Sequence, residues 1–380
     1  MVPRTAAYLP SLRSAFAAER FTVDTFVTFF FRLVAGCLTF PCATLMCFLL
    51  ASEVMGQDNL LDVAKSLFRP IPKRGAGLDG NPAMSDKLEL GKMLFFEPRL
   101  SKAHNISCNT CHQIGRGGAD GRSTSIGHNW QRGDRNAPTV LNAVFNIAQF
   151  WDGRAADLKE QASGPIVNPV GMGTSPERAV AELKGIPGYV EAFGKAFPDE
   201  IDPVNYDNIA EAIAAFEATL ITPNAPFDRY LKGDENALTS EQKEGLALFV
   251  NRGCSSCHNG INVGGGMYAL FGVVEKPGWE FLPPDDKGRI EVTCKMDDKY
   301  VFKVPTLRNV ALTAPYFHSG RSWDLDQAVA VMGTTQLGTQ MKPEEVDNIV
   351  TFLRALTGDQ PQVVYPILPP SVVSTPRPAP

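Results

Sequence analysis

The cysteines and histidines form the clearest chemical pattern in this 380-residue chain. Two segments read Cys108-Asn109-Thr110-Cys111-His112 and Cys254-Ser255-Ser256-Cys257-His258. Two thiols at this spacing can each add to a vinyl group of one porphyrin, and the adjacent imidazole then lies under the ring as an iron ligand. One such motif alone would also suit a redox disulfide or a zinc site, but two copies behind an apolar N-terminal segment favour haem. The sequence therefore predicts two covalently bound c-type haems.

The ligand at the sixth position of each haem iron decides its chemistry, because methionine raises the reduction potential and a removable ligand opens a reactive site. Besides the two motif histidines the chain holds His104, His128 and His318. His128 lies in a glycine-containing loop that could swing, so we predict it as the distal ligand of the first haem. The alternative is an ordinary hydrogen-bonded loop histidine. His104 is expected to be exposed.

Methionines are the candidates for the sixth ligand of the second haem. Those downstream of the second motif are Met267, Met296, Met332 and Met341. Most methionines in proteins simply fill the core, and spacing alone does not choose among these four.

Helical segments are expected on both sides of each motif. Leu90–Phe96 and Glu244–Phe249 precede the motifs and resemble one another as short apolar-faced helices containing a glycine. Apolar residues recur at helical spacing in Ile209–Leu220 and Val346–Leu356, after the motifs. Helix, haem motif, long loop and closing helix is the plan of a small cytochrome c. The sequence therefore predicts a mostly α fold with two cytochrome c-like haem domains in tandem and long loops.

The composition sets the boundaries of this plan. Residues 1–56 contain the uncharged apolar run Leu33–Ala51 and are expected to be an export signal, with an uncleaved membrane anchor as the alternative. We expect the first haem domain over residues 57–222 and the second over 223–358, with a break where Pro223 and Pro226 interrupt the helical pattern. Residues 359–380 are proline-rich and expected to be extended rather than packed.

The charge balance argues against one class of partner. The chain has 36 basic and 41 acidic residues, a net charge of −5, so it has no cationic excess to displace counterions from a phosphate backbone. Binding of nucleic acid is not expected. The 44% hydrophobic content excludes wholesale disorder.

The motifs together resemble those of the bacterial di-haem cytochrome c peroxidases, from about Leu88 to Leu368. The segments that carry the resemblance are Leu94–Ser101 (LFFEPRLS), the loop ending in His128, Arg135–Thr139 (RNAPT), Phe150–Arg154 (FWDGR) and Leu307–Gly320 (LRNVALTAPYFHSG). The resemblance implies a low-potential, peroxide-reducing first haem and a second haem with His/Met ligation that transfers electrons. By motif position, His128 is similar to the releasable distal ligand and Met332 to the stable methionine ligand.

The resemblance also implies roles for residues between the haems. Trp151 is similar to the tryptophan that assists electron passage, although a core aromatic is the alternative. Gln161 and His318 match residues near the peroxide pocket and the haem interface. Asn136, Thr313 and Pro315 match an interdomain calcium site, the last two through carbonyl oxygens suited to a hard cation. The resemblance implies that reduction of the high-potential haem, with calcium bound, releases His128 and admits peroxide.

One position departs from the family pattern. The family has a catalytic acid-base glutamate directly before a methionine, and the corresponding residue here is Gly171, in Asn168–Met172. Glycine cannot transfer a proton, and loss of a positioned acid-base group typically costs on the order of 10² to 10⁴ in rate. Gln161 could orient peroxide but has no titrating proton.

These observations give three functional hypotheses. The leading one is a periplasmic peroxidase that reduces hydrogen peroxide with electrons from a small soluble donor, a cytochrome c or a cupredoxin, and that forms a homodimer. A di-haem oxidase that matures a tryptophan-derived quinone is the second; that relative has a tyrosine where this chain has Met332. The third is a di-haem electron carrier or redox sensor with weak peroxidase activity, which Gly171 makes credible.

Overall fold

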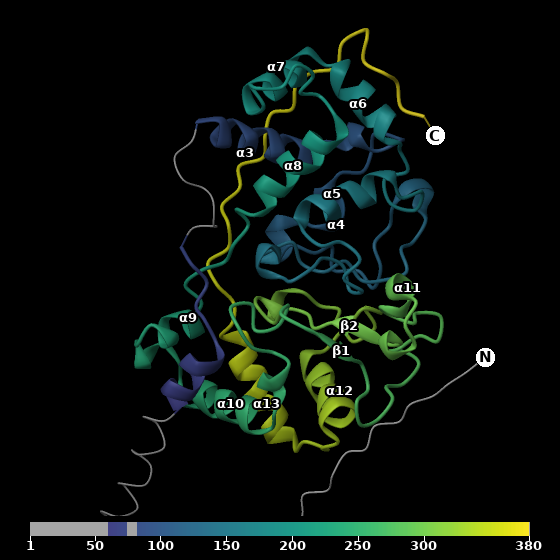
Figure 1. Ribbon diagram of the computed structural model, residues 1–380. Coiled ribbons are helices and arrows are strands. Elements are labelled where there is room, and N and C mark those ends of the chain that lie inside the picture. Colours follow the sequence, from purple (N-terminus) through teal and green to yellow (C-terminus); the bar gives the residue numbers. More distant parts are fainter. Residues whose placement is uncertain (1–59, 74–81, 380) are drawn as a thin grey trace, which may run out of the picture. The chain divides into compact units, whose positions relative to one another are not determined.

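The computed structural model describes residues 60–73 and 82–379 (Figure 1). The segment expected to direct export, residues 1–56, lies outside them. Within the described ranges, none of the helices combines the length and apolar character that a membrane crossing needs.

The described chain is mostly helical, which confirms the predicted fold class. The α-helices after residue 82 are α3 (Pro82–Phe95), α4 (Cys108–Cys111), α5 (Leu158–Val167), α6 (Pro176–Lys184), α7 (Pro187–Ala196), α8 (Tyr206–Glu217), α9 (Pro226–Leu231), α10 (Ser240–Asn251), α11 (Ile290–Thr293), α12 (Leu325–Leu337) and α13 (Pro343–Arg354). Strands β1 (Tyr268–Leu270) and β2 (Val301–Lys303) pair antiparallel, with Tyr268 opposite Lys303.

Helices α3 and α8 form the centre of the first apolar core. Leu90 and Leu94 of α3 are fully buried with Ile213 of α8. The two helices approach so closely at Gly91 that a Cβ there would lie 1.8 Å from the carbonyl oxygen of Ala212. Only glycine permits this crossing, so the glycine of the predicted helix has a packing role.

The second core repeats this arrangement with α10 and α13, which lie side by side in Figure 1. Leu246 and Phe249 of α10 pack with Val350 of α13. A Cβ on Gly245 would lie 1.9 Å from the carbonyl oxygen of Asn348, so the glycine again permits close approach. The helices predicted on both sides of each motif are thus confirmed, and each pair closes one haem domain.

Residues 60–73 pack on the second core, although the sequence placed them in the first domain. The Phe68 ring meets the Phe227 ring edge-on at 5.2 Å between centroids. The backbone N–H of Ile71 donates to Asp228 Oδ1 over 3.2 Å, and Asp228 pairs with the fully buried Arg308 at 2.8 Å. The rings of Phe227 in α9 and Phe249 in α10 lie against Phe68, and local sequence pattern does not show such distant partners.

The C-terminal tail is extended as expected, but it packs on the first domain instead of remaining free. In Figure 1 the yellow tail runs from α13 past α3 and α8 toward α6 and α7. The Phe96 and Tyr365 rings meet edge-on at 4.8 Å, and Arg99 donates to the Pro369 carbonyl and to Ser371 Oγ. Thr375 Oγ1 donates to the Gly185 carbonyl at 2.9 Å. An extended proline-rich backbone leaves its carbonyls free, and Arg99 and Arg178 of the first domain donate to two of them, at Pro369 and Arg377.

Two equivalent asparagines connect the domains at the predicted break. Asn142 and Asn309 both adopt left-handed backbone conformations, with φ of 60° and 59°. Each donates through its Nδ2 to the hydroxyl of Thr222, at 2.7 and 2.9 Å. Both follow a Pro-Thr pair, so the loops after the haem motifs repeat as well as the helices. Thr222 therefore joins corresponding loops of the two domains.

Candidate haem sites

The first cysteine motif presents its thiols and imidazole as a haem would require. Cys108 and Cys111 begin and end α4 and both are free thiols. His112 follows at once, and its Nδ1 lies 3.0 Å from the carbonyl oxygen of Pro138. A Nδ1–H donor to this carbonyl leaves Nε2 unprotonated as the metal-binding nitrogen. Burial lowers the pKa of His112, which favours this neutral ligand form.

The second motif has the same components. Cys254 and Cys257 are free thiols at either side of a 3₁₀ turn. Burial lowers the pKa of His258 to about 4, against the opposing effect of the Val263 and Pro305 backbone groups. His258 Nδ1 makes no hydrogen bond of normal geometry within the described part of the chain. The neutral imidazole and the paired free thiols fit a c-type haem at each motif.

A cavity of 680 Å³ opens beside the first motif. Asn109 and Thr110 of the motif line it on one side, and Gly127 and Asn129 of the distal loop line it on another. Its volume falls within the range of small-molecule and cofactor sites. The second iron ligand expected for the first haem comes from the same loop.

His128 is buried in this loop, with 5% of its surface exposed. Its backbone N–H points at the carbonyl oxygens of Val170 and Gly171, 3.0 and 2.7 Å away. The next two residues, Asn129 and Trp130, have φ of 55° and 63°, a conformation that costs most side chains energy. His128 Nδ1 is buried without a hydrogen-bond partner. The loop thus holds the His128 imidazole inside the protein with its Nδ1 unpaired among the described residues, and its binding to the iron stays a prediction.

Gly171 lies directly against this histidine loop. Its φ lies outside the left-handed region, so the dihedral angle alone does not require glycine. A Cβ would approach the Pro165 carbonyl oxygen at 2.7 Å and Asn168 Cβ at 3.4 Å. Gly173 differs, because its φ is 67° and a Cβ would lie 2.8 Å from the His128 ring. The missing carboxylate at residue 171 therefore goes with a backbone that has no room for a Cβ unless the Pro165 carbonyl or residue 171 itself moves.

A third apolar cluster places Trp151 and Met332 together. Met332 on α12 and Trp151 both pack against a cluster centred on Phe271, Phe281, Leu282 and Phe302. Of the other candidate methionines, Met296 is 73% exposed and Met267 is 36% exposed, while Met341 packs on the second core. The fold gives Met332 an apolar setting shared with Trp151, but its iron ligation stays a prediction.

His318 lies among aromatic rings. It stacks on Phe302 at 4.1 Å and meets Trp151 edge-on at 6.1 Å between ring centroids. Burial lowers the pKa of His318 to about 4, although Asp286 opposes this shift. His318 is therefore a neutral side chain at the junction of the two haem domains.

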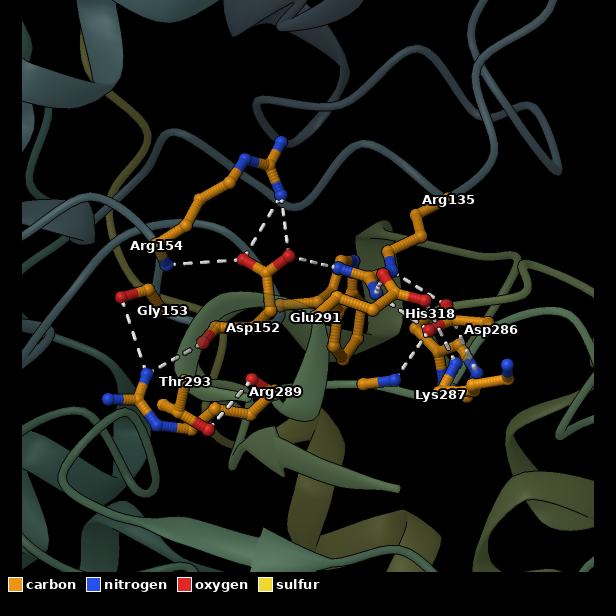
Figure 2. A network of polar contacts seen from close by, with 12 residues as sticks. Arg135, Asp152, Gly153, Arg154, Asp286, Lys287, Arg289, Glu291, Thr293 and His318 are labelled. Atoms are coloured by element: carbon orange, nitrogen blue, oxygen red, sulfur yellow. Dashed lines mark hydrogen bonds and ion pairs between the residues drawn. The ribbon is translucent and has the colours of Figure 1, made fainter. Parts of the chain in front are cut away.

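Arg135 connects the two domains through a network of charges, shown in Figure 2. Its guanidinium donates twice to Asp286, over 2.6 Å each, and once to Asp152 over 2.5 Å. Burial lowers the pKa of Arg135, but these carboxylates outweigh it and the net pKa is raised. Arg289 extends the network by donating to the Asp152 carbonyl at 2.8 Å. The sequence analysis did not identify these partners, although Arg135 and Asp152 both lie in segments that carry the family resemblance.

The residues expected to bind calcium offer oxygen atoms. Asn136 donates through its backbone N–H to the His318 carbonyl and through Nδ2 to the Arg122 carbonyl, which leaves Oδ1 as the acceptor end of the amide. The Thr313 and Pro315 carbonyls accept no backbone hydrogen bond from the described residues. In the same part of the chain no three His, Cys, Asp or Glu side chains gather as a metal site. The donors present are hard oxygens and suit calcium.

Three findings differ from or extend the predicted residue set. His104 is not exposed: its Nε2 lies 3.2 Å from Oε2 of the buried Glu182. Gln161 lies on α5 and is half-buried, and the structure brings it to no other predicted site residue through a hydrogen bond. The sequence did not single out Pro138, whose carbonyl lies beside His112. The Pro-Thr pair that recurs after each motif could have indicated this role.

Known proteins resemble this chain over most of its length. The family model for di-haem cytochrome c peroxidase matches residues 85–236, and the cytochrome c model matches residues 242–357. The chain is 57% identical over 329 residues to cytochrome c551 peroxidase of Pseudomonas aeruginosa, covering 87% of this chain and 95% of the relative. It is 52% identical over 303 residues to cytochrome c551 peroxidase of Nitrosomonas europaea, covering 79% and 88%.

A solved structure is also similar. A MauG-like protein associated with microbial copper homeostasis superposes with a TM-score of 0.65 at 26% identity, covering 76% of this chain and 93% of that protein. The MauG-like relative is thus more distant than the two peroxidases.

Proposed function

The chain belongs to the di-haem cytochrome c peroxidase family and is an oxidoreductase that acts on peroxide, and on this premise we propose its donor, compartment and site. It takes two electrons from a small soluble donor, a cytochrome c or a cupredoxin, and with two protons reduces one hydrogen peroxide to two waters. It works in the periplasm, which the apolar run Leu33–Ala51 supports as an export signal. Haem bound at the two motifs supplies the electron transfer and the peroxide reduction.

The main support for this proposal is that Trp151 contacts both domains. Its Nε1–H donates to the Asn136 carbonyl over 2.9 Å, within the first domain. Its own carbonyl accepts a hydrogen bond of 2.7 Å from the backbone N–H of Lys303 in the second domain. Its ring packs in the cluster that includes Met332. A large polarisable ring held from both sides is suited to pass electrons between the sites.

The loop of His128 acts as the gate for peroxide in this proposal. The carbonyl oxygens of Val170 and Gly171 face its backbone N–H, and its ring Nδ1 has no hydrogen-bond partner in the described part of the chain. Movement of the strained residues Asn129 and Trp130 would release the loop and uncover the cavity beside the first motif. Calcium held by Asn136, Thr313 and Pro315 would fix the chain segments that carry these residues.

We also propose that the protein assembles as a homodimer.

Gly171 favours a second candidate function. Peroxide cleavage needs a proton delivered to the departing oxygen, and no carboxylate side chain exists at this position. A chain with both haems but slow proton delivery would serve as an electron carrier or redox sensor with weak peroxidase activity.

The test is peroxide consumption by the purified two-haem protein with one haem reduced. Wild type should turn over peroxide, and Trp151→Phe should slow the electron supply at least about tenfold. Trp279→Phe is the matched control, since Trp279 is 67% exposed in the second domain and should leave the rate unchanged. A half-reduced wild type that consumes no peroxide would favour the carrier, and equal rates in both variants would refute the role of Trp151.

A further inference from the structure

Lys303 is a buried cation without a counter-charge. It ends β2, and 6% of its surface is exposed. Across the described part of the chain, no carboxylate lies within 4 Å of its ammonium group. Lysine is almost never this buried unless paired, because taking an unpaired charge out of water is costly. Burial accordingly lowers the pKa of Lys303 to about 8.

The neighbouring cations do not share this situation. Arg135 pairs with Asp152 and Asp286, and Arg289 donates to the Asp152 carbonyl. The carboxylates of Asp152 and Asp286 and the Asp152 carbonyl therefore already accept hydrogen bonds from arginines. A bound anionic group could supply the counter-charge that the described residues do not provide.

The position of Lys303 relates it to the second haem motif. The next residue, Val304, exchanges backbone hydrogen bonds with Met267 and Gly265, both from the loop that follows Cys254–His258. Pro305 follows, and its backbone acts on the pKa of His258. Lys303 thus lies two residues before a backbone group that is close to His258, the expected iron ligand of the second haem. Haem carries two propionate carboxylates, which are anions of the required kind.

We propose that Lys303 forms an ion pair with a propionate of the haem attached at Cys254 and Cys257, and thereby raises the reduction potential of that haem. A fixed positive charge in a poorly solvated site favours the reduced iron, which carries one less positive charge. The proposal rests on haem at the second motif but not on peroxidase activity. A protein that failed to consume peroxide would leave it intact.

The experiment is a redox titration of the purified holoprotein, with each haem followed by its absorption spectrum. Lys303→Met removes the charge at similar length and should reduce the equilibrium constant for reduction of the second haem at least tenfold, which equals 59 mV for one electron. Lys303→Arg keeps the charge and should remain within threefold of wild type. Lys295→Met, at an exposed lysine nearby, is the control and should cause no shift.

Three results would overturn the proposal: no shift in Lys303→Met, a shift of the first haem instead, or an equal shift in Lys303→Arg. If Lys303→Met fails to retain its haems, the crystal structure of the wild-type holoprotein decides. A Lys303 Nζ within about 3.2 Å of a propionate oxygen supports the pairing, and a separation above about 4 Å from both propionates refutes it.

Discussion

Replacing Gly171 with glutamate tests whether this protein lacks a positioned acid. The φ of Gly171 is outside the left-handed region, so the backbone dihedral angle itself would not strain a side chain at this position. The new Cβ would meet the Pro165 carbonyl oxygen at 2.7 Å. Pro165 lies one helical turn after Gln161 on α5, so the carboxylate would start beside the segment that carries this predicted pocket residue.

The magnitude follows from two opposing effects. A positioned acid-base group contributes about 10² to 10⁴ in rate, or roughly 3 to 5 kcal/mol at about 1.36 kcal/mol per decade. The contact at 2.7 Å is with a backbone carbonyl, so the backbone has to move to admit the side chain, and a misplacement of about 1 Å can cost about 10²-fold. We therefore expect Gly171→Glu to raise peroxide turnover by about 10- to 100-fold.

The assay is steady-state peroxide turnover per haem, with the half-reduced protein, saturating donor and calcium. Gly171→Gln is the matched control, because glutamine has nearly the same size and no titrating proton. The glutamate variant should gain rate and a new pH dependence, while the glutamine variant should gain neither. Equal rates in wild type and both variants would show that another group or ordered water already delivers the proton.

The remaining predictions concern ligation, tail docking and pH. Met332→His should lower the potential of the second haem, because imidazole favours ferric iron more than a thioether does; an unchanged potential in a redox titration would point to another methionine. Thr375→Val removes the hydroxyl that donates to Gly185 and should increase opening of the tail about tenfold, measured by hydrogen exchange, with intact protection arguing against docking. Burial raises the pKa of Glu217 to about 8 from the ordinary 4.5, so its contribution to stability is full below pH 4.5 and is lost as pH rises to 8. In unfolding experiments Glu217→Gln should remove this pH-dependent decrease in the free energy of unfolding, which is roughly 3 to 5 kcal/mol at about 1.36 kcal/mol per pKa unit. If the decrease persists in the variant, other groups cause it.

The helices around each motif were predictable because their information is local. Apolar residues at helical spacing define α8 and α13, and Gly91 and Gly245 mark the close crossings in a repeated pattern. The motif cysteines and histidines were predictable for the same reason, since five consecutive residues contain the whole signal.

Contacts between distant segments were not predictable from such patterns. In the sequence Phe68 looks like any other core aromatic residue, and no neighbouring residue indicates that Phe227 packs against it. Arg135 and Asp286 are 151 residues apart, so their pairing depends on how the two domains meet. The lack of a counter-charge at Lys303 is likewise a property of the folded chain, because burial and missing partners cannot be read from a short segment.

Residues 60–73 pack on the second domain and the C-terminal tail packs on the first, so a chain cut between the domains should not fall apart. A single protease cut at residues 223–225 would give two fragments, each holding a part that packs on the other. Residues 60–73 of the front fragment would stay embedded beside Phe227 and Arg308, and the tail of the rear fragment would stay docked on Arg99 and Gly185. Two non-covalent contacts therefore hold the domains together in addition to the covalent link, since each fragment contributes one segment that packs on the other. The nicked protein is expected to persist as a complex of the two fragments.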